Sequence, residues 1–170
     1  MQTVQFAAEE LCANIEKALG LLGKLTEISA EKEALLTAGD IEGLRSAAEN
    51  EEEIIAVFNQ TEKDRMNCAD ALSQAIGIFN NDITLTELIE KLPDHTMRER
   101  LSELRTRLLN AADNLFRQND RLGELLQMQI GYTDYMINLL YAPKTRNHSY
   151  DTQGSKKDEA GGLSLLDLHI

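Results

Sequence analysis

Apolar residues recur at steps of three and four along most of the chain, which is the period of an amphipathic α-helix. Over residues 3–38 they form one stripe, made of Val4, Ala8, Leu11, Ile15, Ala18, Leu19, Leu22 and Leu25. A second series covers residues 41–76 and contains Ile41, Leu44, Ala47, Ala48, Ile54, Ile55, Phe58, Met66, Ala69, Leu72 and Ile76. The pattern predicts two long helices, each with one face turned toward a core.

A tight turn is predicted between these two helices, at residues 37–40. Gly39 can adopt the left-handed conformation that often ends a helix. Asp40 can cap the next helix, because its side-chain oxygen can accept a hydrogen bond from an N–H group of the first turn. We therefore expect the two helices to pack side by side in opposite directions.

A short helix is predicted within residues 84–92, after Gly77 and a polar stretch break the preceding pattern. Thr84 and Glu87 have the spacing of a capping box. Pro93 then ends the helix. Four apolar residues would hold this helix across the end of the long ones: Leu85, Leu88, Ile89 and Leu92.

A last long helix is predicted over residues 94–141, and it carries two adjacent apolar stripes. The first contains Leu101, Leu104, Leu108, Ala111, Leu115, Leu122 and Leu125. The second contains Leu109, Ala112, Phe116, Leu126, Ile130 and Ile137. A double stripe is wider than a two-helix seam requires, so we expect this helix to pack against two neighbours. Its basic residues are all arginines, which can pair with acids of the first two helices.

Together these elements predict an all-α protein. We expect an elongated antiparallel helical bundle, with three long helices and one short helix, over residues 1–141. Residues 142–162 show no period and contain Pro, Gly, Ser, Lys and Asp, which indicates a flexible segment. The sequence LSLLDLHI at residues 163–170 is apolar again. Residues 142–170 are therefore predicted to be a mostly disordered C-terminal tail with a terminal apolar segment.

Charge and cysteine content exclude several function classes. The net charge is −12, and residues 1–62 hold most of the excess acid, which disfavours nucleic acid and anionic membranes as partners. Cys12 and Cys68 fit no CxxC spacing and are expected to be reduced core residues. The sequence shows no signal peptide and no apolar run of about 18 residues, so we expect a cytoplasmic protein without membrane insertion.

No pattern in the sequence is typical of catalysis. There is no Glu-x-x-His pair for a di-metal site, and His95, His148 and His169 lie far apart in the chain. A glycine-rich phosphate loop and a GxSxG motif are also absent. We therefore expect no enzyme activity, cofactor or metal.

The long helices favour binding of a partner's amphipathic helix in a groove that ends near residues 136–143. For Leu139 and Leu140, the alternative is ordinary helical core.

The helical pattern, the motif LLTAGDIEGLRSAAENEEEII (residues 35–55) and the ending YMINLLYAP…YDTQG resemble FlgN-type flagellar export chaperones, over residues 1–154. The ending includes a Tyr-x-x-x-Gly element at residues 150–154. This resemblance implies a chaperone that binds the C-terminal amphipathic helix of hook-filament junction (hook-associated) proteins. It would keep these clients unassembled and deliver them to the export gate.

The resemblance also implies where the sites lie. A tyrosine that follows the last helix would dock to the cytoplasmic domain of the export-gate membrane protein, which suggests Tyr150, with Tyr141 as the competing candidate. The segment LSLLDLHI looks like the apolar face of a client helix, and could cover the groove in cis or in a homodimer; the alternative is an extension without function. The client site would comprise Leu126, Ile130, Ile137, Leu139, Leu140 and Tyr141.

Two other functions fit the same helices. A self-assembling helical-bundle adaptor with no export role would form a defined oligomer and bind no peptide. A chaperone for flagellin or for a virulence-type secretion system is the other alternative.

Overall fold

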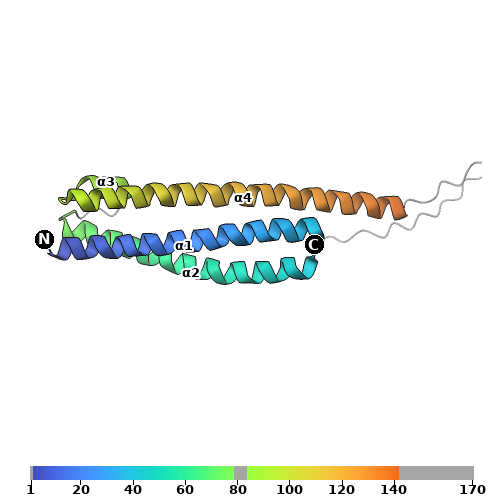
Figure 1. Cartoon of the computed structure of the whole chain (residues 1–170), viewed down its shortest axis with the longest axis horizontal. Coiled ribbons are helices and arrows are strands. Elements are labelled where there is room, and N and C mark those ends of the chain that lie inside the picture. Colours follow the sequence, from blue (N-terminus) through green and yellow to red (C-terminus); the bar gives the residue numbers. More distant parts are fainter. Residues whose placement is uncertain (1, 79–83, 142–170) are drawn as a thin grey trace, which may run out of the picture.

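The computed structural model describes residues 2–78 and 84–141 (Figure 1). Within these ranges the chain forms four α-helices and no strand. They are α1 Gln2–Ala38, α2 Ile41–Ala75, α3 Leu85–Glu90 and α4 His95–Tyr141. The prediction of an all-α protein is therefore confirmed. The predicted tail, residues 142–170, lies outside the described residues.

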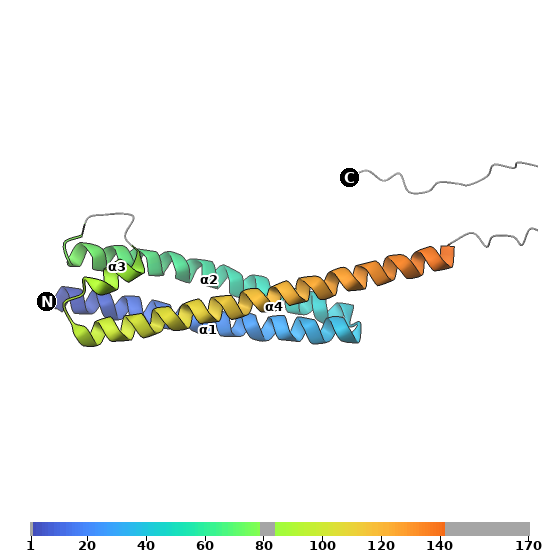
Figure 2. The ribbon, with the colours of Figure 1, turned by 90° about the horizontal axis from the view of Figure 1, so that it is seen from above.

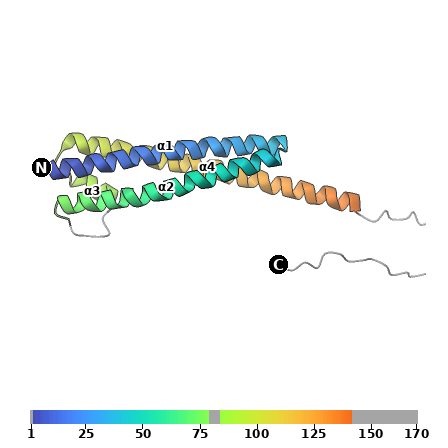
Figure 3. The same cartoon turned by 90° about the horizontal axis from the view of Figure 1, so that it is seen from below.

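The long helices lie along one axis, with α1 between α2 and α4 (Figures 1 and 2). α2 returns along α1 in the opposite direction (Figure 3), whereas α4 runs in the same direction as α1. No Cα atom of α2 lies within 8 Å of one in α4. The second neighbour of α4 is the short α3, which lies beside the beginning of α4 only (Figure 2).

The described helices therefore leave the second apolar stripe of α4 uncovered along most of its length. Leu109 is 54% exposed and Phe116 is 70% exposed. The expectation that two neighbours cover both stripes is wrong, because α1 takes the first stripe and α3 is too short to cover the second. Helical periodicity shows that a face is apolar but not what lies against it.

The turn between α1 and α2 has the predicted capping geometry. Gly39 has φ 71°, and its N–H donates to the Leu36 carbonyl oxygen at 3.1 Å. A side chain at this φ would meet its own backbone, which explains the glycine. The N–H of Gly43 donates to Asp40 Oδ1 at 2.9 Å, so the predicted N-cap is confirmed.

The largest core cluster lies at the end of the molecule where α1 begins and α2 ends. Here α3 closes the structure, and its predicted capping box between Thr84 and Glu87 is present. Leu88, Ile89 and Leu92 are buried in this cluster, as predicted. The other buried members are Ala7, Ala8, Leu11, Cys12, Ile15, Leu72, Met97, Leu101 and Leu104.

Polar contacts accompany the apolar packing of α4 along α1. Arg100 pairs with Glu16 at 2.9 Å and Arg121 pairs with Glu33 at 2.6 Å. The hydroxyl of Ser29 donates to the side-chain oxygen of Asn119 at 2.9 Å. Among the described residues, no ion pair joins α4 to α2, so the predicted arginine pairing holds for the first helix only.

Candidate protein-binding site

The last part of α4 extends past the turn that joins α1 and α2 (Figure 2). α1 ends at Ala38, whereas α4 continues without a break through Gly123 and Gly131 to Tyr141. Every residue from 131 to 140 is exposed except Met136, which is half-buried. This part of α4 therefore has no described helix beside it.

Exposed apolar side chains gather on this projecting part and just before it, where α4 passes the α1–α2 turn. We call them the distal surface, and its members are Leu126, Met128, Ile130, Tyr132, Tyr135, Ile137, Leu139 and Leu140. Leu139 is 59% exposed and Leu140 is 74% exposed. The alternative that these two leucines belong to the core is therefore wrong. An apolar helix surface of this extent is typical of a site where another protein binds.

The distal surface is also nearly free of charge. Residues 125–141 contain one charged residue, Asp134, although 27% of the whole chain is charged. Tyrosine and methionine occur instead, and these are the residue types enriched where proteins bind each other. The local composition therefore indicates an interface.

A cavity of about 320 Å³ lies where α4 passes the α1–α2 turn. We call it the turn cavity. Asp134 is the only ionisable residue in its lining, and Gly39 and Ile41 bring the turn itself to its wall. The full lining is Leu36, Gly39, Ile41, Leu44, Leu126, Gln129, Ile130, Thr133 and Asp134. The mostly apolar lining suits an apolar side chain of a partner.

The distal surface has two opposite faces, because successive helical residues are turned by about 100°. The first, which we call the cavity face because two of its members line the turn cavity, holds Leu126, Ile130, Ile137 and Leu140. The second, which we call the outer face, holds Met128, Tyr132, Tyr135 and Leu139.

Most of the predicted client-binding residues lie on the cavity face, but not all of them. Leu126 and Ile130 line the turn cavity, and Ile137 and Leu140 continue the same face beyond it. Leu139 lies on the outer face. Tyr141 is the last residue of α4, and Tyr150 lies outside the described residues. The expected groove near residues 136–143 has no second wall in the described chain; the two-walled site lies further back, at the turn cavity.

The part of the site contributed by α1 and α2 is not among the residues predicted from the sequence. Leu36, Ile41 and Leu44 line the turn cavity, yet from the sequence Ile41 and Leu44 are assigned only to the stripe of their own helix and Leu36 to no stripe. One feature of the sequence indicates this part of the site, namely the apolar residue Ile41 directly after the helix cap. At the end of a hairpin, such a residue has no core to face. Ile41 is 67% exposed.

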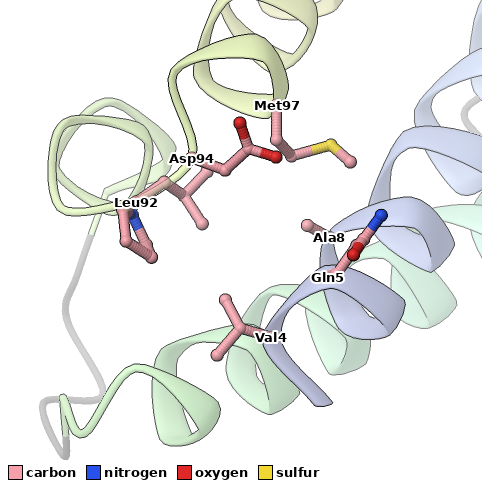
Figure 4. A pocket seen from close by; sticks show the side chains of 7 residues that line it. Val4, Gln5, Ala8, Leu92, Asp94 and Met97 are labelled. Atoms are coloured by element: carbon pink, nitrogen blue, oxygen red, sulfur yellow. The ribbon is translucent and has the colours of Figure 1, made fainter. Parts of the chain in front are cut away.

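A second cavity, of about 370 Å³, lies at the opposite end of the molecule (Figure 4). Side chains of α1, such as Val4 and Ala8, face Leu92 and Met97 across it (Figure 4). Ala8, Leu92 and Met97 belong to the core cluster. We therefore attribute this cavity to imperfect packing around the α3–α4 connection.

Nothing in the described part of the chain points to other chemistry. None of its helices combines the length and hydrophobicity needed to cross a bilayer. Its histidine, cysteine and acidic side chains form no group of three or more that could hold a metal ion.

The comparisons with known proteins agree with this picture. The sequence model of one family, described as FlgN protein, matches residues 1–158. No curated protein and no solved structure matches the chain. Because the family match spans most of the 170 residues, the resemblance seen in the sequence is confirmed. The chain belongs to the FlgN family of flagellar export chaperones.

Proposed function

We propose that this protein is a cytoplasmic chaperone that binds the C-terminal amphipathic helix of hook-filament junction proteins along the cavity face of α4. Binding covers the apolar side of the client helix and so keeps the client unassembled. The chaperone then delivers its client to the cytoplasmic domain of the export-gate membrane protein. Tyr150 is our candidate for docking to the gate, and Tyr141 is the competing candidate.

The observation that supports this proposal most directly is the uncharged, exposed cavity face next to an apolar cavity. An amphipathic helix binds by laying its apolar face in a groove, with one or two side chains inserted as anchors. The turn cavity can accept such an anchor between Ile41 and Ile130. Ile137 and Leu140 would continue the contact along the projecting part of α4.

Calorimetric titration with a synthetic peptide from the C-terminus of a hook-filament junction protein tests the proposal. We expect micromolar binding or tighter. Ile130→Asp should weaken it by at least about tenfold, because the new carboxylate would lose its water against apolar client side chains. Leu140→Asp should act in the same direction.

Leu109→Asp is the matched control, because Leu109 is also exposed on α4 but lies outside the distal surface. It should leave the peptide affinity unchanged. Leu139→Asp, on the outer face, should weaken binding less than Ile130→Asp. Equal losses of peptide affinity in Ile130→Asp and Leu109→Asp, with helicity intact by circular dichroism, would contradict the proposed site. The absence of binding to the wild-type chain would contradict the proposed client.

The second candidate function is a self-assembling helical adaptor with no export role. The outer face favours it, because Met128, Tyr132, Tyr135 and Leu139 are spaced by four, three and four residues, as in a two-helix seam. This candidate requires a defined oligomer by light scattering together with no peptide binding in the titration.

A further inference from the structure

No element of the described residues 2–78 and 84–141 covers the outer face of the distal surface. Tyr132 is 62% exposed and Tyr135 is 61% exposed, and Met128 and Leu139 are exposed to a similar degree. The cavity face on the other side of α4 is also exposed. A helix that is apolar on opposite sides is normally covered on both of them. One partner helix on the cavity face would leave the outer face in water.

The chain itself contains a segment suited to the outer face. Residues 163–170 hold five large apolar side chains, Leu163, Leu165, Leu166, Leu168 and Ile170. These residues lie beyond the part of the chain that the FlgN family model matches, which ends at residue 158. Family membership therefore does not explain the segment.

Electrostatic repulsion does not oppose contact between residues 163–170 and the outer face. The segment contains one carboxylate side chain, Asp167, and the four residues of the outer face carry none. In a chain with a net charge of −12, two surfaces so poor in acid are unusual. Apolar contact between them would bring almost no like charges together.

The segment can reach the outer face. Between Tyr141, the last residue of α4, and Leu163 lie 21 residues, and a flexible linker of that length spans about 25 Å. The outer face extends over residues 128–139, about 17 Å of helix. Because both are parts of one chain, the effective concentration of the segment at the face is on the order of 1 mM. Even a weak apolar contact would be well populated at that concentration.

We propose that residues 163–170 dock on the outer face of the same molecule, against Met128, Tyr132, Tyr135 and Leu139. Docking shields the outer face from other proteins, including a second copy of this chain, and leaves the cavity face open. It also holds the projecting part of α4 in a helical conformation. The inference does not depend on the identity of any client.

Disulfide trapping in the full-length chain tests the docking. The pair Tyr135→Cys and Leu166→Cys is placed in a background in which Cys12→Ala and Cys68→Ala remove the natural thiols. The matched control pair is Ile137→Cys and Leu166→Cys, because residue 137 is closer to the linker but lies on the cavity face. The Tyr135→Cys pair should form its intramolecular disulfide at least about tenfold faster than the control pair, since docking raises the local concentration at one face only.

Three outcomes would overturn the proposal. Equal rates for both pairs would show that the segment is not docked. A faster control pair would place it on the cavity face. A disulfide that joins two molecules, at a rate that rises with protein concentration, would show that a second copy supplies the segment.

A measurement with the natural cysteines in place guards against misfolding of the background variant. Hydrogen exchange is compared between the wild-type chain and the double variant Leu165→Asp and Leu166→Asp. The amides of residues 128–139 should exchange about tenfold faster in the variant, because local opening of a helix is easier without packing. The amides of residues 7–15, in the core, should not change. Unchanged exchange at residues 128–139 would overturn the proposal.

Discussion

Truncating one leucine at each end of α4 distinguishes the core from the distal surface. Leu101 is completely buried in the core cluster, whereas Leu140 is 74% exposed on the projecting part of the same helix. Both substitutions to alanine remove the same atoms from the same kind of helical backbone. Leucine and alanine differ little in helix propensity, so packing dominates the difference between the two variants.

The expected changes in the free energy of unfolding follow from how deeply each leucine is buried. Leu101→Ala removes side-chain atoms that have no contact with water and leaves a cavity, so it should lower the free energy of unfolding by about 3 kcal/mol. In a chain of this size the melting temperature should fall by roughly 10 °C. Leu140→Ala removes atoms that are mostly in water, so its effect should stay below about 0.5 kcal/mol.

Urea unfolding followed by far-UV circular dichroism measures both changes. The slope of the free energy against urea concentration should be the same in the wild-type chain and both variants, because the surface exposed on unfolding hardly changes. A loss of stability for Leu140→Ala as large as that for Leu101→Ala would contradict the assignment of Leu140 to an exposed surface. It would mean that the end of α4 is part of a packed core.

Three further predictions concern the caps and the thiols. Asp40→Ala should lower the free energy of unfolding by about 1 kcal/mol in urea titrations, because it removes the N-cap hydrogen bond at the start of α2. Burial is the main cause that raises the pKa of both thiols, and Cys12 is fully buried, so Ellman's reagent should modify Cys68 much faster than Cys12. Hydrogen bonds from Thr84 lower the pKa of the Glu87 carboxyl, so the native state binds its proton less readily than the unfolded state. The stability advantage over Glu87→Gln should therefore be present near neutral pH and disappear as the pH falls below the usual glutamate range, in urea titrations at several pH values.

The sequence predicted those parts of the fold that depend on local rules. Gly39 and Asp40 end one helix and start the next within four residues, and Thr84 and Glu87 cap α3 in the same way. Such motifs need no knowledge of distant residues, because their hydrogen bonds are made to the adjacent backbone. The positions of these helices could therefore be predicted almost to the residue.

Which element packs against each helix face could not be predicted from such local motifs. The stripe containing Leu109 and Phe116 has the same period as a buried stripe, yet none of the described helices covers it. What decides its exposure is how α4 lies along α1, which depends on contacts between residues far apart in sequence, such as Ser29 with Asn119 and Arg121 with Glu33.

For the same reason, only part of the candidate site could be predicted from the sequence. The apolar and uncharged end of α4 is visible in the sequence, so Ile130 and Leu140 could be named from it. The turn cavity is not visible, because it forms only where Ile41 meets a helix that begins more than fifty residues later. The division of the distal surface into two faces follows from helical geometry once the projection of α4 is known.

Hydrogen exchange of the full-length chain, with and without a saturating client peptide, tests whether the distal part of α4 is the binding site. Bound peptide should slow exchange in two regions only, at residues 126–140 of α4 and around residues 36–44 at the turn. These are the regions that carry the cavity face and the wall of the turn cavity. Protection confined to the opposite end, around Val4, Leu92 and Met97, or no protection in the presence of bound peptide, would contradict the claim that the distal part of α4 is the binding site.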